Sequence, residues 1–471
     1  MRSSQDRSTA GRLTAIGLLI GTCIGGVVWL AGMDRAQRLA VAGLGSVGMA
    51  VAVLTMGALL VGTSRASRAV ASVGALVLVA VRLKYAFVST PNPFVDFRIF
   101  RIAGRIVLEG GNPYAMSANV FINPPTALPL CVGFAAMPDW VGHAWLAFNF
   151  FGGLALVPLA WLALGGRREG RWLPEAFVLA ILAAVIGFSD AAVVQNNLGQ
   201  ISTFTALAIL GSLALLATGR RLAGGLGLAV ATMKVATMLP FCLVAIDRKK
   251  IDFRCLAGIA LGVVVLCCSA TRPDLLPSRL ADNLRRIGAQ GEIGRINDQS
   301  FSGPVNWAII GFQHAYYRLG IVDRRLLVVM EGLTLAALGV PLAWAAWRRV
   351  LARPALLALL GLYATIFLYH RTYDLVLLAL PLTYATGLAR RGPTRARGPA
   401  AASGMAMVIA LYLRMEGLRV MNQGHEAQGW VARSFLASPA TWLVLVALAL
   451  LARAAWCTRG EELPAAATTT P

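Results

Sequence analysis

An aspartate stands at the start of an amphipathic segment, where its carboxylate could carry out acid-base chemistry. Asp96 precedes residues 97–108, in which apolar and basic side chains repeat at helical spacing on separate faces. A carboxylate within hydrogen-bond reach of a hydroxyl can remove its proton as the oxygen attacks an electrophile. The alternative role is a helix cap, and both roles are compatible because a helix N-terminus keeps a carboxylate ionised. We predict Asp96 as a general base.

Three arginines share the polar face of this segment, which predicts a helix lying in the membrane interface. They are Arg98, Arg101 and Arg105. Simple interfacial anchoring is the expected role of at least two of them, and contact with a lipid phosphate is the alternative. Arg98 is the candidate for the phosphate contact.

Lys234 interrupts an apolar stretch in a chain that has only four lysines. A charge in a membrane segment costs about 2.5–3.5 kcal/mol on insertion scales and is functional by default. Lys234 is therefore the best single cation to stabilise a developing phosphate charge. The alternative is that its side chain extends to the interface.

Two amide pairs could bind sugar hydroxyls, because amides both donate and accept hydrogen bonds. Asn197 and Gln200 are expected to begin a helix, where helix capping is the equal alternative. Asn297 and Gln299 lie in a polar stretch of more than thirty residues, a length that is uncommon unless functional or disordered. A solvated loop is the alternative for that pair.

His370 and Arg371 lie between two apolar runs, away from the basic loops. Positive-inside placement therefore does not account for their charges. Contact with phosphate or sugar is one interpretation and pairing with Asp374 is the other. The two interpretations are compatible.

The elements that position these residues are transmembrane helices. Hydrophobic residues make up 58% of the chain and charged residues 14%, and the mean hydropathy is +0.69. About a quarter of the residues are charged in a typical soluble domain. The net charge of +22 comes from short arginine clusters between apolar runs, so it indicates membrane topology rather than nucleic-acid binding.

The hydropathy pattern predicts an all-α polytopic bundle of about fourteen transmembrane helices in one domain, residues 1–460, before a disordered tail, 461–471. The expected helices are 12–32, 39–62, 69–88, 141–164, 174–189, 201–218, 222–234, 236–246, 255–270, 326–347, 354–369, 375–388, 403–421 and 435–452.

Arginine placement puts both termini in the cytoplasm and four polar segments on the outer side. The short run 124–137, with its internal proline, is expected to be interfacial or re-entrant. Runs 222–234 and 236–246 are expected to form a broken pair that turns at Lys234. The outer segments are 91–123, 189–200, 271–322 and 369–374.

Neither a metal site nor a disulfide framework is supported. The seven cysteines are scattered, mostly inside apolar runs, and the four histidines are isolated. A lone Asp96 is a poor site for a divalent metal. We expect no cofactor, and the sequence gives a divalent metal no support.

Several motifs follow one another along the chain in a fixed order. An aspartate in the first large outer loop is followed by an interfacial helix, a Gly-x-Asn-Pro-Tyr motif that ends at Tyr114, and a Pro-Pro pair. Further along lie three more blocks: Asn197-Leu-Gly-Gln200, Ala223-Gly-Gly-Leu-Gly-Leu with Lys234 and Pro240, and Asn297-Asp-Gln299-Ser. This ordered set resembles glycosyltransferase family 87 of the GT-C superfamily. The resemblance covers roughly residues 85–390, and residues 12–62 contribute extra N-terminal helices.

The resemblance implies a GT-C-like bundle in a bacterial plasma membrane that uses a polyprenyl-phosphate sugar. The sugar is expected to be mannose or arabinofuranose, transferred to a glycan or glycolipid hydroxyl with inversion. It also implies a donor-binding set of Arg98, Tyr114, Asn197, Gln200, Lys234, Asn297, Gln299, His370 and Arg371.

Three alternatives remain at this stage. A transporter or lipid flippase also needs many helices and buried charge, but no internal repeat is visible in the sequence. A non-catalytic scaffold of a membrane complex would tolerate asparagine at Asp96. A third reading is an enzyme of another GT-C family, which would differ in its acceptor loops.

Overall fold

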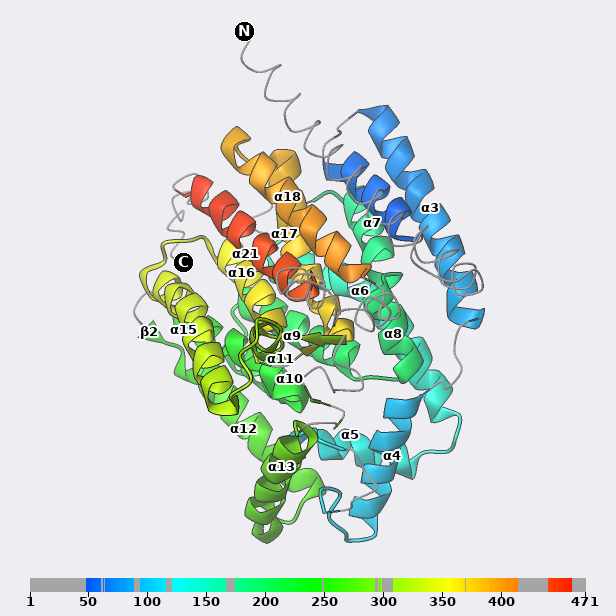
Figure 1. Ribbon diagram of the computed structural model, residues 1–471, viewed down its shortest axis with the longest axis vertical. Helices are drawn as coiled ribbons and strands as arrows, with labels where there is room; N and C mark the ends of the chain where they lie inside the picture. The colour runs from blue at the N-terminus through cyan, green and yellow to red at the C-terminus, as the bar shows by residue number, and fades with distance from the viewer. Residues whose placement is uncertain are drawn as a thin grey trace.

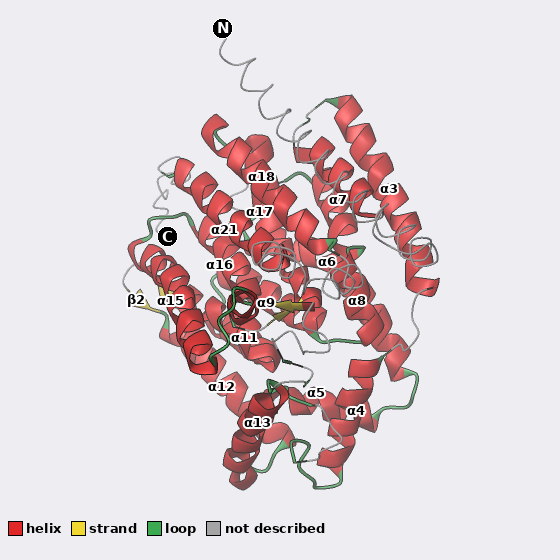
Figure 2. Ribbon diagram, in the orientation of Figure 1, coloured by secondary structure: helices red, strands yellow, loops and turns green. Residues whose placement is uncertain are grey.

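The computed structural model describes residues 48–60, 62, 64–88, 94–115, 121–166, 174–247, 250–292, 295, 297–298, 308–368, 370–413 and 439–459. Within them the fold is all-α, as the hydropathy pattern predicts (Figure 2). The strands are two short pairs: β1 (Ile246–Asp247) with β2 (Lys250–Ile251), and β3 (Ile309–Ile310) with β4 (His370–Arg371).

A helix Gly48–Leu60 precedes the labelled helices of Figure 1. The α-helices that follow are α3 (Arg65–Val88), α4 (Val95–Leu108), α5 (Leu128–Ala136), α6 (Val141–Ala163), α7 (Ala176–Gly187), α8 (Asp190–Leu198), α9 (Ser202–Ala217), α10 (Arg221–Ala231), α11 (Val235–Met238), α12 (Phe253–Ala270), α13 (Leu276–Gln290), α14 (Phe312–Arg318), α15 (Arg324–Arg348), α16 (Arg353–Ile366), α17 (Ala379–Arg391), α18 (Thr394–Leu411) and α21 (Pro439–Cys457). The 3₁₀ helices are η1 (Pro125–Ala127), η3 (Thr232–Lys234), η4 (Leu239–Ala245), η5 (Pro273–Leu275) and η7 (Thr372–Leu378).

The described residues do not confirm a count of fourteen transmembrane helices. Six helices are long and apolar enough to cross a membrane, or seven if the bent pair α7 and α8 forms one span. Several expected spans are shorter helices, such as α9 with 16 residues and α16 with 14. The expected helix 12–32 lies outside the described residues, and so do 39–47, 414–421 and 435–438 of the expected helices 39–62, 403–421 and 435–452.

The chain doubles back at Lys234, although residues 221–245 have the length and composition of one span. Twenty-five residues of straight helix would be about 37 Å long. Instead, Asp252 connects the two ends: its N–H donates to Ala245 O (2.7 Å), and its Oδ2 lies 3.3 Å from Arg221 Nε. The geometry thus matches the expected broken pair, with Lys234 at the turn.

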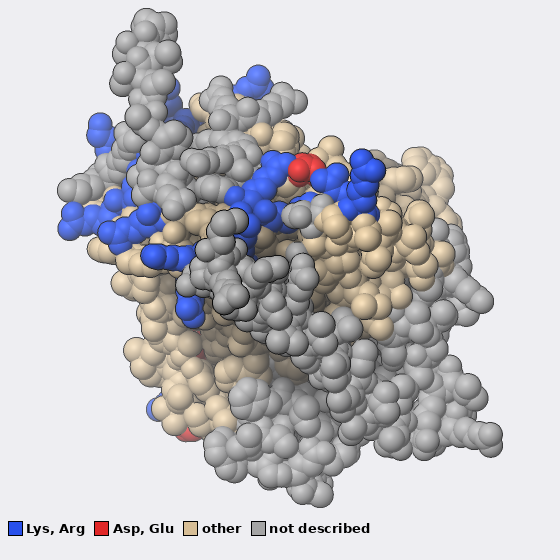
Figure 3. Space-filling view, turned by 90° about the horizontal axis from the view of Figure 1, so that it is seen from above, with Lys and Arg blue, Asp and Glu red and all other residues tan. Residues whose placement is uncertain are grey.

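Basic side chains gather at one end of the bundle. Arg391 and Arg68 face Glu175 at the start of α7, at 2.5 and 3.9 Å. Arg390 donates to Leu59 O at the end of the helix Gly48–Leu60 (2.6 Å). Figure 3, which looks onto this end, shows the arginine and lysine side chains spread across it. We call it the arginine-rich end.

The opposite end of the bundle is formed by α4, α5 and α13 (Figure 1). The helix α5, which covers most of the expected interfacial run 124–137, has only nine residues, too few to cross a bilayer core of about 30 Å. It packs on α4 so closely that a Cβ on Gly104 would lie 2.0 Å from Cys131 O. An aromatic cluster that includes Phe97, Phe134 and Trp145 fills the space between α4, α5 and α6.

The main core lies around α16 and α17 in the middle of the bundle. Every residue of α16 from Ala355 to Ile366 is buried, and so is the whole apolar window of the span 372–391. These helices are covered by protein on all sides rather than by lipid. The segment between them, which carries His370 to Asp374, is therefore held inside the bundle.

The close contact of α4 and α5 gives a stability prediction. Gly104→Ala would place a methyl group against the α5 backbone, and overpacking of this kind costs roughly 1–3 kcal/mol. The thermal midpoint of the purified protein should fall. Gly133→Ala on α5 is the matched control, because its Cβ would meet nothing within 4 Å. Equal midpoints for the two variants would contradict the contact.

Candidate active site

Asp96 lies in the first turn of α4 and does not cap the helix, contrary to the capping interpretation. Phe94 occupies the N-cap position in a left-handed conformation (φ 67°). Its N–H donates to Asn197 O (2.8 Å), which ties the start of α4 to the end of α8. The Asp96 carboxylate is therefore available for another partner.

That partner is Gln200, in the turn between α8 and α9. Gly199 ends α8 with φ 69°, a conformation that favours glycine. The same glycine touches α4, since a Cβ there would lie 2.7 Å from Phe97 Cβ. Gln200 Nε2 donates to Asp96 Oδ2 (2.5 Å) and to Tyr373 Oη (3.2 Å). One amide thus links α4 to η7.

A buried group of charges lies beside this contact. Lys234 Nζ, at the turn of the doubled-back segment, donates to Asp374 Oδ1 (2.5 Å) and to Ser202 Oγ (2.8 Å). His370 Nδ1 lies 3.2 Å from the other carboxylate oxygen of Asp374. The expected pairing of His370 with Asp374 is present. Lys234, predicted as the cation that stabilises a phosphate charge, has a carboxylate partner in Asp374.

Tyr373 and Arg371 connect this group to its surroundings. The Lys234 ammonium lies 4.8 Å from the centre of the Tyr373 ring. Arg371 Nη2 donates to Asn297 Oδ1 (2.9 Å), which brings the long polar stretch 271–322 to the site. The pairing of β3 with β4 opposes Ile310 to His370 and fixes the segment that carries both basic residues.

The environment of Asp96 favours proton uptake. Burial raises the pKa of its carboxyl above the ordinary 3.8, and this outweighs the lowering by the Gln200 hydrogen bond, Arg371 and Lys234. A carboxylate with a raised pKa is a stronger base than one in water. The arrangement therefore places a basic carboxylate beside a group of cations.

Buried amides behind the site hold Gln200 in place. Asn149 Nδ2, from α6, donates to Gln200 O (3.2 Å), and Gln195 Nε2 donates to the same oxygen (3.1 Å). Gln195 Oε1 accepts from Thr203 N (2.8 Å), and Trp145 Nε1 donates to the preceding carbonyl, of Gly199 (3.0 Å). The turn is fixed from both sides.

Not all the predicted site residues meet here. Arg98 is exposed. Because it lies two positions after Asp96, its side chain points to another side of α4. Tyr114 is buried in the aromatic cluster, where its hydroxyl donates to Asn123 O (2.9 Å). Asn197 lies in the last turn of α8 and does not begin a helix, because Gly199 ends that helix. Gln299 lies outside the described residues.

Sequence reasoning missed several residues of the site. The sequence predicts Asp374 only as a partner of His370 and gives Tyr373 and Ser202 no role, although Ser202 lies two positions after Gln200. Asn149 was not noticed, although a lone amide in an apolar helix is a usable signal. Its role depends on a partner 51 positions away, which no local pattern reveals.

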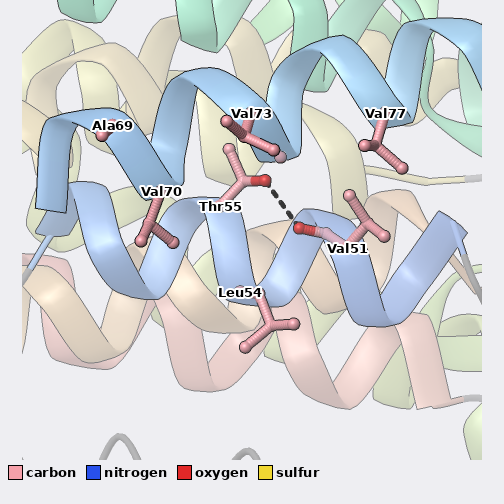
Figure 4. Close-up of a pocket in the computed structure, with 8 residues that line it drawn as sticks. Val51, Leu54, Thr55, Ala69, Val70, Val73 and Val77 are labelled. Atoms are coloured by element: carbon pink, nitrogen blue, oxygen red, sulfur yellow. Dashed lines mark hydrogen bonds between the residues drawn. The ribbon is translucent and has the colours of Figure 1, made fainter. Parts of the chain in front are cut away.

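The described residues form no second candidate site. Among the described residues, no three histidine, cysteine or acidic side chains gather as they would around a metal ion. A groove of about 400 Å³ runs between the helix Gly48–Leu60 and α3, lined by apolar side chains and Thr55 (Figure 4). The Thr55 hydroxyl donates to Val51 O of its own helix (2.6 Å), so the groove offers no free polar group.

Fold and site together define an all-α membrane protein whose polar residues from distant segments meet at the helix ends. The model of glycosyltransferase family 87 matches residues 121–381, more than half of the chain. The chain therefore belongs to glycosyltransferase family 87, which makes it a glycosyltransferase. Comparison with curated proteins and with solved structures finds no significant match. The matched range includes Gln200, Lys234 and His370 but not Asp96.

The support for Gln200 gives a second prediction. Asn149→Ala would free the turn, and a misplacement of about 1 Å can cost roughly 100-fold in rate. We expect a lower kcat for glycosyl transfer, and a less than additive loss when Asn149→Ala is combined with Gln200→Ala.

Ser403→Ala is the matched control, because it removes another buried hydrogen bond, to Ala447 O (2.8 Å). It should lower the thermal midpoint and leave kcat unchanged. If the Asn149→Ala and Gln200→Ala losses multiply fully, Asn149 does not act through Gln200.

Proposed function

We propose that this glycosyltransferase moves a sugar from a polyprenyl-phosphate donor to a hydroxyl on the outer side of the membrane, with inversion. The observation that carries the proposal is the contact of Asp96 with Gln200 beside the cations Lys234 and Arg371. A base for the attacking hydroxyl and positive charge for a leaving phosphate are the two requirements of this reaction.

Asp96 acts as the base. The acceptor hydroxyl loses its proton to the carboxylate as its oxygen bonds to the anomeric carbon, and the glycosidic bond to the phosphate breaks. A single carboxylate suffices for inversion, because the departing phosphate is stable as an anion and needs no acid. The raised pKa of Asp96 helps this step, since the group is a stronger proton acceptor than a carboxylate in water.

The phosphate is held by the basic residues of the segment 370–371, and Lys234 supports them from behind through Asp374. Asp374 offsets the positive charge of Lys234, so Lys234 contributes mainly by orienting Asp374 and His370. Arg371 is the cation that contacts the phosphate more directly. The other ring nitrogen of His370, Nε2, is buried and makes no hydrogen bond with the described part of the chain.

The distribution of charge supports an outer location for the site. Lys and Arg side chains spread across the arginine-rich end (Figure 3), and positively charged loops face the cytoplasm. Asp96 lies in the first turn of α4, which belongs to the opposite end (Figure 1). We infer that both termini are cytoplasmic in a bacterial plasma membrane and that the acceptor, a glycan or glycolipid, is reached from outside.

Mannose or arabinofuranose is the proposed sugar, on the strength of the family resemblance alone. No metal enters the proposal, because one carboxylate and the surrounding cations supply the chemistry. No observation favours the transporter alternative, and the family assignment speaks for an enzyme.

The role of Asp96 is tested by Asp96→Asn. Asparagine keeps an oxygen for Gln200 but cannot take a proton, so transfer from polyprenyl-phosphate mannose or arabinose should fall by roughly 100- to 10,000-fold. The wild-type rate should rise with pH as Asp96 ionises, through a pKa above 3.8. Asp274→Asn, an exposed aspartate paired with Arg272, is the control and should keep full activity.

Stability gives an independent readout of Asp96. Because its folded pKa is raised, its contribution to stability is fully present below the unfolded pKa and is lost as pH rises through the folded pKa. Asp96→Asn should therefore have a higher thermal midpoint than wild type at neutral pH, with a gap that closes in acid. Full transfer by Asp96→Asn would refute the proposed base.

The ion pair of Lys234 and Asp374 is tested by single and double variants. Lys234→Met alone leaves a buried carboxylate without its cation, and such a loss typically costs about 3–5 kcal/mol. Lys234→Met with Asp374→Asn should recover most of the thermal midpoint, because no charge is left unpaired. The double variant should still transfer sugar slowly if the pair orients the phosphate site. A double variant with the kcat of wild type would show that the pair has only a structural role.

A further inference from the structure

The helix α13 lies in the stretch 271–322 and buries its polar side. Its buried residues are Arg279, Asn283 and Gln290, with exposed fractions of 5%, 2% and 9%. Arg279 donates to Gly111 O (2.9 Å) and Thr271 Oγ1 (3.0 Å), and Asn283 donates to Ile122 O (3.0 Å). Polar contacts therefore fix α13 to the outer segment 91–123.

A second side of α13 is apolar and uncovered. Leu280, Leu284 and Ile287 are 47%, 62% and 44% exposed. With 3.6 residues per turn, they fall within roughly 60° of arc, about a quarter turn from the buried polar side. A helix in water would show the reverse arrangement, with leucines inside and arginine and asparagine outside.

The third side of α13 is polar and exposed. Arg285 projects from it, with a side chain that is 77% exposed and pairs with Asp282 (2.6 Å), and Ser278 lies on the same side. A helix with one side on protein, one apolar and one polar fits the boundary between acyl chains and water. The positive charge of Arg285 there complements lipid phosphates.

We propose that α13 lies in the outer leaflet of the membrane, with Leu280, Leu284 and Ile287 in contact with the acyl chains. The occupant of this surface is the lipid bilayer itself. In Figure 1 the helix lies at the same end as α4, the amphipathic helix that carries Asp96. Residues 276–290 are therefore a membrane anchor and not a solvated loop, whatever reaction the protein performs.

This anchor reaches the site directly. Gln290, the last residue of α13, accepts from Asn297 N through its carbonyl (3.0 Å). The Asn297 side chain in turn accepts from Arg371 (2.9 Å). Docking of α13 into lipid thus sets the level of Arg371 and its neighbours relative to the bilayer surface.

Site-directed spin labelling tests the proposal in the full-length protein. A nitroxide-bearing amino acid is incorporated at position 280, 284 or 287, in turn, which avoids thiol labelling of the seven native cysteines. The protein is placed in nanodiscs of phosphatidylcholine and phosphatidylglycerol. Power saturation then compares collisions with oxygen, which concentrates in lipid, and with a water-soluble nickel complex.

Two further positions calibrate the result. Leu333 on α15, 66% exposed on a candidate span, is the lipid standard, and Arg272, with a side chain 78% exposed, is the water standard. We expect the oxygen-to-nickel ratio at all three α13 positions to lie nearer that of position 333. Ratios nearer that of position 272 at these positions would overturn the proposal.

Discussion

Lys234 and Asp374 form an ion pair inside an apolar bundle, and most of the site depends on it. Taking two charges out of water costs several kcal/mol per ion, which is offset only where geometry is good and further hydrogen bonds complete the shell. Ser202 and His370 complete it here. Separating the two residues would leave each as an unpaired buried charge. The ion pair therefore holds together the turn at Lys234, the start of α9 and the segment 370–374.

From this pair a chain of one cation–π contact and two hydrogen bonds runs to the opposite side of the site. The Lys234 ammonium lies over the Tyr373 ring, Tyr373 meets Gln200, and Gln200 meets Asp96. Side chains that are locked before substrate arrives need not reorganise during the reaction, which is how fixed dipoles and charges lower a barrier. Burial of the Asp96 carboxylate then raises its pKa and makes it a better base.

The lipid surroundings act on the same residues from outside. The helix α4 carries Asp96, and α13 leads to Asn297, so two amphipathic helices border the site. The lipid-linked donor that we propose would have its phosphate at the head-group level and its chain in the bilayer. Helices that lie at this level therefore bring protein side chains to the depth at which such a phosphate is found.

The sequence by itself determined the properties that depend on local pattern. Hydropathy and helical spacing predicted an all-α membrane protein, the ordered motifs pointed to the family that the comparison confirmed, and the turn at Lys234 followed from two short apolar runs. The tertiary structure decided which side chains meet. It paired Lys234 with Asp374 across 140 positions and left Arg98 and Tyr114 outside the site. Hydropathy cannot distinguish a full span from a shorter helix covered by protein, and hydrogen-bond partners distant in sequence leave no periodic signal.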